Sequence, residues 1–353
     1  MSLHFRMREW FLRIVKSVYL DNCPRAGLSD GPIAILDVCK NTEYVSELLQ
    51  GILSKIHHHK VLVFMDKSVN RPYSHQLQVI IYFLMLIVLP TLGTITAIIL
   101  AFQGHFSWDN VIMCIALTVL TELGITMGFH RMLVHQSFTA HPVVRFILLM
   151  LGSMALQGPP SNWASIHLKH HANTDVEDDP HSPTFKGWLH AHCGWIFSID
   201  PEVHLQARQT FGKKFQQDTM VTFFDATFFA WSMLGLFIPF LIGGLEGLLW
   251  GGFVRLFLAL NFTWSVNSIC HIFGSKMFKT PDQSTNNFIV GILAMGEGWH
   301  NNHHAFPRSA FHGLAWWQFD LSGYLIWILE KLRLVKQVYR VPEEILQDKL
   351  ITK

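Results

Sequence analysis

The chain has 353 residues, half of them hydrophobic and only 15% charged, with a formal net charge of +2. Soluble globular domains carry about 25% charged residues, so this composition excludes an ordinary soluble domain and indicates a membrane protein. The sequence has no basic stripe, which argues against a nucleic acid as partner. The five cysteines are scattered and form no CxxC pair, so we expect free thiols rather than a disulfide framework.

Residues 1–70 are expected to form a separate cytosolic region of unknown role. Their first part mixes charged and apolar residues too freely for a cleaved signal peptide. Residues 41–56 could form a soluble helix, and the histidine run 57–59 is interpreted as a solvated polar stretch rather than a metal site.

Four apolar stretches are long enough to cross a membrane, which takes about 20 residues. They are residues 77–102, 111–129, 220–242 and 248–271. The connections after the first and the third stretch contain no Lys or Arg, whereas residues 1–70 are rich in both. Because basic residues favour the cytoplasmic side, we expect both termini and the long middle segment to be cytosolic.

Two shorter apolar stretches are expected to lie in the membrane interface. Residues 143–156 are interrupted by Arg145, and residues 321–334 end in charged side chains, so neither suits a full crossing. The sequence therefore predicts an all-α integral membrane protein with four transmembrane helices and a cytosolic helical cap. The membrane domain covers residues 71–340, and residues 341–353 form a C-terminal tail.

Nine histidines border these apolar stretches, and eight of them fall into three clusters. The clusters are His130 with His135, then His167, His170 and His171, then His300, His303 and His304, and the ninth histidine is His271. With residues 143–156 in the interface, all nine would lie on one face of the membrane. One metal ion binds about four to six ligands, so the number of histidines predicts two ions held between distant segments.

The spacing within the clusters indicates how the imidazoles could point. On a helix, residues at i, i+3 and i+4 share a face, so each HxxHH cluster can direct several rings to one place. His170 and His171 diverge by about 100°, which suits ligation to different ions. His130 and His135 are roughly 140° apart on an α-helix, so they would straddle a site unless the helix loosens between them.

The residues alone do not identify the metal, since imidazole suits zinc, copper, iron and nickel. Soluble di-iron bundles use Glu-x-x-His pairs, and only Glu297 and His300 have that spacing beside a cluster, so that scheme does not fit. Zinc has no redox chemistry. Iron is therefore favoured only if the reaction is oxidative.

The histidines lie within longer motifs that carry a family resemblance. The motifs are GITMGFHRMLVHQSF (124–138), WASIHLKHH (163–171), DDPHSP (178–183), TWSVNSICHIFG (263–274) and GEGWHNNHHAFP (296–307). In this order they resemble the membrane fatty acid desaturases, most closely the delta-9 acyl desaturases and their bacterial and cyanobacterial members. The resemblance covers roughly residues 75–340.

The resemblance implies a di-iron enzyme that uses molecular oxygen to insert a cis double bond, at the delta-9 position, into a saturated acyl chain. It makes the nine histidines the ligands of two iron ions, lets Asn267 contact one iron through a water, and adds no other catalytic group. His181 is not a ligand and is expected to hold its loop. Electrons would come from a separate protein of the ferredoxin, rubredoxin or cytochrome b5 type. The bacterial members favour a bacterial inner membrane over the endoplasmic reticulum.

A kinked substrate tunnel is also implied by the resemblance. Gln157, Trp163, Thr263 and Trp264 match the residues that line its kink. The residues alone leave another interpretation open, because the two tryptophans could be aromatics of the membrane interface.

Thr118 and Glu122 match positions near the closed end of that tunnel. A glutamate inside a span is costly and is a candidate functional residue, although it could instead pair with another helix. Arg255 could pair with Glu122 or reach toward a lipid headgroup.

The acyl carrier is left open by departures from the animal acyl-CoA enzymes. Those enzymes have Arg-Asp, which contacts CoA, where this chain has Ser165 and Ile166, and an asparagine where it has Gly158. The substrate could therefore be an acyl-CoA or an acyl chain esterified in a membrane lipid.

Three rival functions remain at this stage. The same architecture could hydroxylate an alkyl chain or a sterol. A metal transporter would need ionisable residues along the membrane midplane, whereas the histidines cluster at one edge. A haem-binding electron carrier would need paired histidines in facing spans, and only His271 ends a span suitably.

Overall fold

The computed structural model describes residues 73–198 and 200–351. The expectations for residues 1–70, including the helix 41–56 and the histidine run 57–59, lie outside the described residues. Within them, the cysteines Cys114, Cys193 and Cys270 are free thiols, as the sequence predicts.

The first long helix is built from three segments, α3 (Tyr73–Phe83), η1 (Leu84–Val88) and α4 (Leu89–Phe102). Residues Gln76–Phe102 are long and apolar enough to span a membrane, and this matches the predicted first span. Pro90 lies in the first turn of α4. Proline has no N–H and interrupts the i→i−4 hydrogen-bond ladder, and the π-helical segment η1 immediately precedes it.

The second long helix consists of α5 (Trp108–Leu123) and the π-helical segment η2 (Gly124–Val134). Its apolar stretch runs over Trp108–Val134. The predicted end of this span at residue 129 is too early, because the helix continues through the first histidine of the cluster with every side chain of η2 buried.

The third long helix, Thr219–His271, folds back on itself. Its segments are α12 (Thr219–Gly247), η4 (Leu248–Val254), α13 (Arg255–Ser268) and the 3-10 turn η5 (Ile269–His271). The backbone leaves helical geometry at Gly243 (φ −121°) and Gly244 (φ +59°), and glycine tolerates the second of these without strain. An Arg255 guanidinium nitrogen lies 3.2 Å from the Gly235 carbonyl, so the arms before and after the bend run antiparallel.

These arms coincide with the predicted stretches 220–242 and 248–271. Within the described residues, three helices are long and apolar enough to cross a membrane, where the sequence analysis counts four spans. The numbers differ because the third helix contains both arms.

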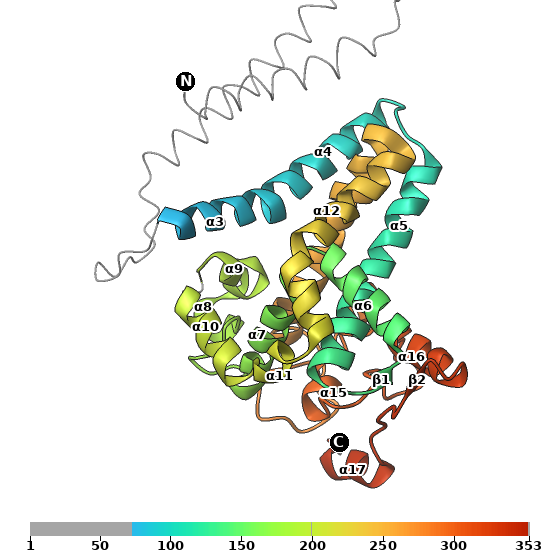
Figure 1. The fold of residues 1–353 in the computed structure, drawn as a ribbon. Coiled ribbons are helices and arrows are strands. Elements are labelled where there is room, and N and C mark those ends of the chain that lie inside the picture. Colours follow the sequence, from blue (N-terminus) through green and yellow to red (C-terminus); the bar gives the residue numbers. More distant parts are fainter. Residues whose placement is uncertain (1–72, 199, 352–353) are drawn as a thin grey trace, which may run out of the picture. The chain divides into compact units, whose positions relative to one another are not determined.

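The turn between the first and second long helices and the bend within the third meet at one end of the bundle (Figure 1). The Ser107 N–H donates to Glu246 Oε1 over 2.6 Å. A Cβ atom on Gly243 would lie 2.0 Å from Asn110 Oδ1, so a larger residue there would have to displace the Asn110 amide. The histidine clusters lie toward the other end of the same helices.

A short apolar helix, α6 (Pro142–Met154), packs against η2 and α12. It has 13 residues, too few for a crossing, in agreement with the expectation for residues 143–156. A Cβ atom on Gly124 would lie 2.1 Å from the Gly152 nitrogen, so glycine pairs allow the two helices to touch.

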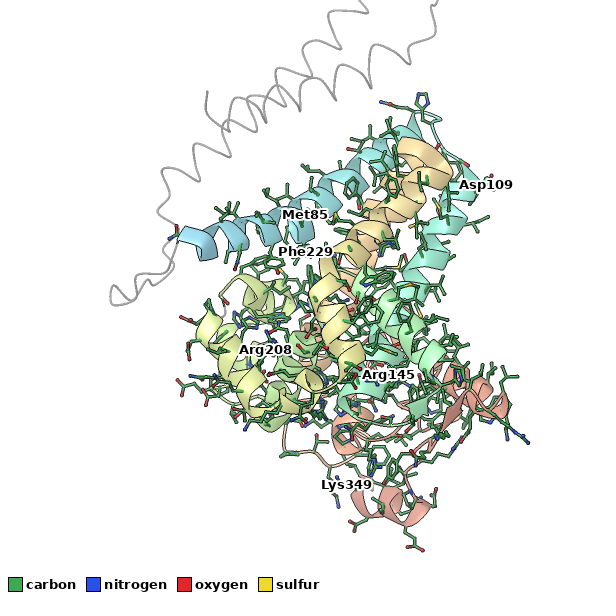
Figure 2. All side chains as sticks on the ribbon, viewed as in Figure 1. Met85, Asp109, Arg145, Arg208, Phe229 and Lys349 are labelled. Carbon is green, nitrogen blue, oxygen red and sulfur yellow. The ribbon has the colours of Figure 1, made fainter. Side chains whose placement is uncertain are left out.

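The start of α6 is tied to the start of α12. Arg145, labelled in Figure 2, forms an ion pair with Asp218. Asp218 also caps α12 by accepting hydrogen bonds from the N–H groups of Met220 and Val221, which stabilises the first turn of the helix.

Arg255 is fully buried and is placed differently from both sequence expectations. It donates to the backbone carbonyls of Gly251, Met154 and Gly235. It therefore neither pairs with Glu122 nor reaches a headgroup, but joins α6 and the two arms of the third helix.

The remaining elements form a cap at the histidine end. They are α7 (Pro160–Ala172), α8 (Pro183–Lys186), η3 (His190–Gly194), α9 (Trp195–Ser198), α10 (Pro201–Thr210), α11 (Lys213–Gln216), α14 (Phe288–Leu293), α15 (His300–Ala305), α16 (Leu321–Lys331) and α17 (Glu343–Lys349). Proline occupies the first turn of α7, α8 and α10, where a missing N–H costs nothing. Residues 321–331 form the helix expected at 321–334.

One small departure from an all-α fold is a two-stranded ribbon. The strand β1 (Thr139–Ala140) pairs antiparallel with β2 (Val335–Lys336), with Thr139 opposite Lys336. The ribbon ties the chain after η2 to the chain after α16.

Candidate metal centre

The nine predicted histidines come together in two adjacent groups. In each group the nearest nitrogen atoms all lie within 4.8 Å of one another. The five-histidine group consists of His130, His135, His167, His171 and His303, and the four-histidine group consists of His170, His271, His300 and His304. Each group could hold a metal ion.

The π-helical segment η2 explains how His130 and His135 come to lie on the same side of the helix. The His135 N–H bonds to the His130 carbonyl over 3.1 Å, which is the i→i+5 pattern of a π-helix. Residues five apart are then one turn apart and share a face, and the two ring centroids are 4.7 Å apart. The helix therefore loosens, which is one of the two arrangements that the spacing allows.

The two HxxHH clusters each supply both groups. On α7, His167 and His171 face the five-histidine group while His170 faces the other. On α15, His303 faces the five-histidine group while His300 faces the four-histidine group. The prediction that adjacent histidines 170 and 171 diverge to different sites agrees with this arrangement.

The nitrogen atoms within each group are packed as metal ligands would be. The Nε2–Nε2 distances are 3.1 Å for His130 and His303, 3.2 Å for His135 and His167, 3.0 Å for His167 and His171, 2.9 Å for His171 and His303, and 3.0 Å for His271 and His300. Two imidazoles bound at about 2.0–2.1 Å and at right angles would place their nitrogens about 2.9 Å apart. The buried Nε2 atoms of His170 and His304 have no hydrogen-bond partner, so a cation would satisfy them.

The protonation state of these rings also suits a metal. Burial lowers the pKa of His135, His167 and His303 well below the usual value, and the neighbouring histidines lower it further. The same causes lower the pKa of His171 and His304. Neutral imidazole is the form that binds metals, so these histidines are in the metal-binding form at neutral pH.

Carboxylates hold four of the rings from behind, through Nδ1. His170 Nδ1 lies 3.0 Å from both oxygens of Asp179, His271 Nδ1 lies 2.9 Å from Asp175, His304 Nδ1 lies 3.1 Å from Asp282, and His130 Nδ1 lies 2.7 Å from Glu297. A carboxylate that accepts from Nδ1–H fixes the tautomer and directs Nε2 toward the metal.

Glu297 is the centre of a buried network beside the five-histidine group. Its carboxylate contacts His130, accepts from Arg131 over 3.1 Å and lies 3.1 Å from His312 Nδ1. Burial alone would raise the pKa of Glu297, but His130, His312 and Arg131 outweigh burial and hold that pKa well below the usual value. Arg131 continues the network to Asp320.

Sequence reasoning missed most of these supporting residues. Asp175, Asp282, His312 and Asp320 lie outside the clusters and have no periodic spacing to them. Asp179 falls in the quoted DDPHSP motif and Glu297 in the quoted GEGWHNNHHAFP motif, so these two carboxylates were the available signals. His181, expected to hold that loop, packs against the His170 ring with centroids 4.3 Å apart, and its N–H donates to Asp179.

Two cavities that share four lining residues border the five-histidine group. The larger has a volume of about 300 Å³ and is lined from several elements, including Tyr82 of α3 and Ile196 of α9. The smaller, about 40 Å³, is lined by residues that include Glu122 and Thr126. The residues that line both cavities are Trp163, His167, Thr263 and Asn267.

All four residues predicted to line the kink border the larger cavity, and three of them are hydrogen-bonded in a row. Trp163 Nε1 donates to Gln157 Oε1, Gln157 Nε2 donates to Thr263 Oγ1 over 2.8 Å, and Thr263 donates to Glu122. Trp163 also stacks on the His167 ring, and Trp264 is 95% buried. Both tryptophans therefore line the larger cavity.

The remaining predicted residues differ in whether they border the cavities. Glu122 borders the smaller cavity and accepts from Thr263 of α13, so it does bond to another helix. Asn267 borders both cavities, beside His167. Thr118 borders neither of them and donates to the Cys114 carbonyl over 2.8 Å.

Comparison with known proteins gives a consistent result. Residues 106–322 match the family model described as fatty acid desaturase. The chain is 38% identical to the hex-5-enoyl-[acyl-carrier protein] acetylenase of Moorena producens (strain JHB), over 77% of this chain and 90% of that protein. It is 39% identical to the sn-1 stearoyl-lipid 9-desaturase of Anabaena variabilis, over 67% and 86%. It is 37% identical to the acyl-CoA C20 Delta5-desaturase of Anemone leveillei, over 73% and 83%.

Proposed function

Because the chain belongs to the fatty acid desaturase family, whose members are oxygen-dependent oxidoreductases, we propose that it inserts a cis double bond into a saturated acyl chain. The proposed position is delta-9, and the proposed cofactor is a pair of iron ions. The observation that carries the proposal is the set of nine convergent imidazoles beside a cavity that runs past His167.

The two histidine groups supply the ligands in this proposal. His130, His135, His167, His171 and His303 would hold one iron, and His170, His271, His300 and His304 would hold the other. Asn267 would contact one iron through a water. When bound, the irons supply the redox chemistry with oxygen that removes two hydrogens from adjacent methylenes.

The protein groups around the cavities position the acyl chain. A chain that runs from the larger cavity into the smaller one passes between Trp163, Thr263 and Asn267. Gln157, Trp163 and Thr263 bond to one another, so their polar atoms are satisfied and the rings remain for contact with methylenes. Burial of the site excludes bulk water, which prevents side reactions.

We place Thr118 and Glu122 toward the methyl end of the chain. Glu122 lines the smaller cavity, and Thr118 lies one helical turn before Glu122 on the same face of α5. At the closed end of the tunnel, these two residues would limit the length of acyl chain beyond the double bond.

The proposed topology has four crossings, with the termini and the metal centre on the cytosolic side of a bacterial inner membrane. Two observations support it. The antiparallel arms of the third helix are each long enough to cross, and the turns after the first and third crossings meet at one end.

The acyl carrier and the electron donor are parts of the proposal that the relatives inform. Similar proteins act on an acyl-lipid, an acyl-CoA and an acyl chain attached to acyl-carrier protein, as their names state. We propose an acyl-CoA or acyl-lipid substrate. Two electrons per turnover would come from a separate ferredoxin, rubredoxin or cytochrome b5 type protein.

Expression in a host that lacks this activity tests the proposal. Fatty acids are analysed by gas chromatography and mass spectrometry for each lipid class, with the His303→Ala variant as a matched control. We expect a new cis alkene with the wild type and none with the variant, at equal amounts of membrane-inserted protein. An alkene yield from His303→Ala equal to wild type would refute His303 as a ligand.

The same measurement separates the rivals. A hydroxylated product without an alkene would identify a hydroxylase. A triple bond would place the chain with its acetylenase relative. A transporter needs a separate assay of metal uptake: uptake into cells without any lipid product would favour it.

A further inference from the structure

The two histidine groups differ in the charge that surrounds them. In the four-histidine group, three of the four rings are backed by carboxylates, those of Asp175, Asp179 and Asp282. In the five-histidine group, one ring of five is backed by a carboxylate, that of Glu297.

The three aspartates are held firmly in place. Asp175 accepts from His271 and from the Gln283 N–H with one oxygen, and from Ser182 Oγ with the other. Its φ of +58° is a left-handed backbone conformation, which is strained for a residue other than glycine and persists only when the surroundings fix it.

Asp179 and Asp282 are equally constrained. Asp179 accepts from His170 and from the N–H groups of Asp175 and His181. Asp282 accepts from His304 and from the N–H of Ser284. The side chains of all three aspartates are at most 8% exposed, so their charges are screened little by water.

The compensating cations are also distributed unequally. Arg131 pairs with Glu297 and so offsets the charge beside the five-histidine group. Among the described residues, no Lys or Arg forms a salt bridge with the three aspartates. Lys276 binds the backbone carbonyl of Asp282 rather than its carboxylate.

We infer that the two iron ions differ in reduction potential because different numbers of carboxylates lie behind their histidine ligands. The anionic surround of the four-histidine group stabilises the ferric over the ferrous ion, since a nearby negative charge in a medium of low dielectric constant favours the higher positive charge. That ion has the lower reduction potential, and Asp175, Asp179 and Asp282 are positioning residues that set it. The inference rests on the proposed pair of irons.

A redox titration of the full-length protein, loaded with iron-57 in detergent and followed by Mössbauer spectroscopy, tests this. The wild type should show two separate one-electron midpoints. Asp179→Asn and Asp282→Asn should each raise only the lower midpoint. A tenfold change in the equilibrium between the two oxidation states corresponds to about 59 mV. Glu297→Gln should move only the other midpoint.

Metal content gives a second measurement. Loss of a carboxylate behind a ligating histidine typically weakens metal binding about 10–100-fold. We therefore expect the aspartate variants to lose the four-histidine iron first on exposure to a chelator. The control is Asp178→Asn, an exposed carboxylate on the same loop, which should leave both midpoints and both irons unchanged.

The outcomes distinguish a failure of the metal assignment from a failure of the inference about the two reduction potentials. Wild-type protein that binds fewer than two irons would overturn the metal assignment itself. Two bound irons that share one midpoint would overturn this inference alone. So would aspartate variants that move both midpoints equally, or neither. If one aspartate variant does not fold, the wild-type titration and the other variant still decide the matter.

Discussion

Arg131 shows how one residue next to a proposed metal ligand can organise a site. It is fully buried and donates to Glu297, to Asp320 and to the Ala310 carbonyl. Its neighbour His130 is held by the same Glu297. The guanidinium therefore fixes the position of a ligand without touching it.

The pair of Arg131 and Asp320 gives a stability prediction. The Asp320→Asn variant should lower the free energy of unfolding by about 3–5 kcal/mol, because it leaves a buried guanidinium only partly compensated. Denaturant unfolding in detergent, followed by tryptophan fluorescence, measures this. Glu330→Gln, which breaks an exposed pair with Arg340, should cost at most about 1 kcal/mol. Equal effects of the two variants would contradict the prediction.

The same carboxylate sets a pH dependence. Burial opposes ionisation of Asp320, but Arg131 outweighs it and holds the pKa of Asp320 below the usual value. The pKa of this carboxyl is about 3.9 in the unfolded chain and lower in the folded protein. This contribution to stability should therefore be intact from pH 7 to about pH 4 and disappear as the pH falls through the folded pKa.

At the scale of elements, the π-helical segment η2 is what brings His130 and His135 to one face. It depends on close contact with α6, where Gly124 faces Gly152. A larger residue at either position would push the helices apart and shift the first cluster.

The Gly124→Ala variant should therefore lose iron and stability together. The added Cβ would meet backbone atoms 2.1 Å away, and overpacking of this kind costs about 1–3 kcal/mol. Iron per chain and the unfolding midpoint are the measurements. Gly252→Ala is the matched control in a helix, because its Cβ would meet only flexible leucine side chains. Normal iron content in Gly124→Ala would show that the glycine contact is dispensable.

The C-terminal helix α17 clamps the segment that carries the third histidine cluster (Figure 2 labels Lys349). Lys349 donates to the Ala305 carbonyl, next to His304, and the Lys349 carbonyl accepts from the Lys279 N–H. Ile351 bonds to Met277 through the backbone.

Removal of residues 341–353 should loosen this cluster. We expect faster loss of iron to a chelator and a lower melting temperature in detergent, since the Lys349 side-chain bond to Ala305 and the backbone bonds to Lys279 and Met277 are gone. Removal of only residues 352–353 is the control and should behave as wild type. A truncated protein that retains iron as well as wild type would contradict the clamp.

The sequence predicted those elements that composition and periodicity control. Apolar length located the long helices, and the HxxHH spacing predicted that His170 and His171 face different groups. The predicted end of the second helix was wrong. The polar side chains among residues 130–134 interrupt the apolar stretch, but a π-helix continues through them. The partners of the ligands were not predictable, because Asp175 and Asp282 reach His271 and His304 from loops whose position depends on tertiary packing.

At the scale of the whole molecule, the bundle has two distinct ends. The turns at residues 103–107 and 243–247 meet at one end, and both histidine groups lie at the other. The proposed four crossings predict that these turns face away from the cytosol.

Cysteine labelling in intact cells measures this orientation, after the native cysteines have been replaced. A cysteine at His105 or Leu245 should react with a membrane-impermeant maleimide added outside. A cysteine at Gln206 in the cap, which is also exposed, should react only after the cells are opened. Labelling of all three from the same side would exclude the proposed topology.

The interleaving of the ligands has a consequence for biosynthesis. Both histidine groups take residues from α15, at His300 to His304, and α17 then secures that helix. A ribosome must therefore complete nearly the entire polypeptide before either cage closes. Insertion of the proposed irons should follow translation, and the newly made apoprotein must be protected in the cell from copper, which binds nitrogen ligands more tightly than iron does.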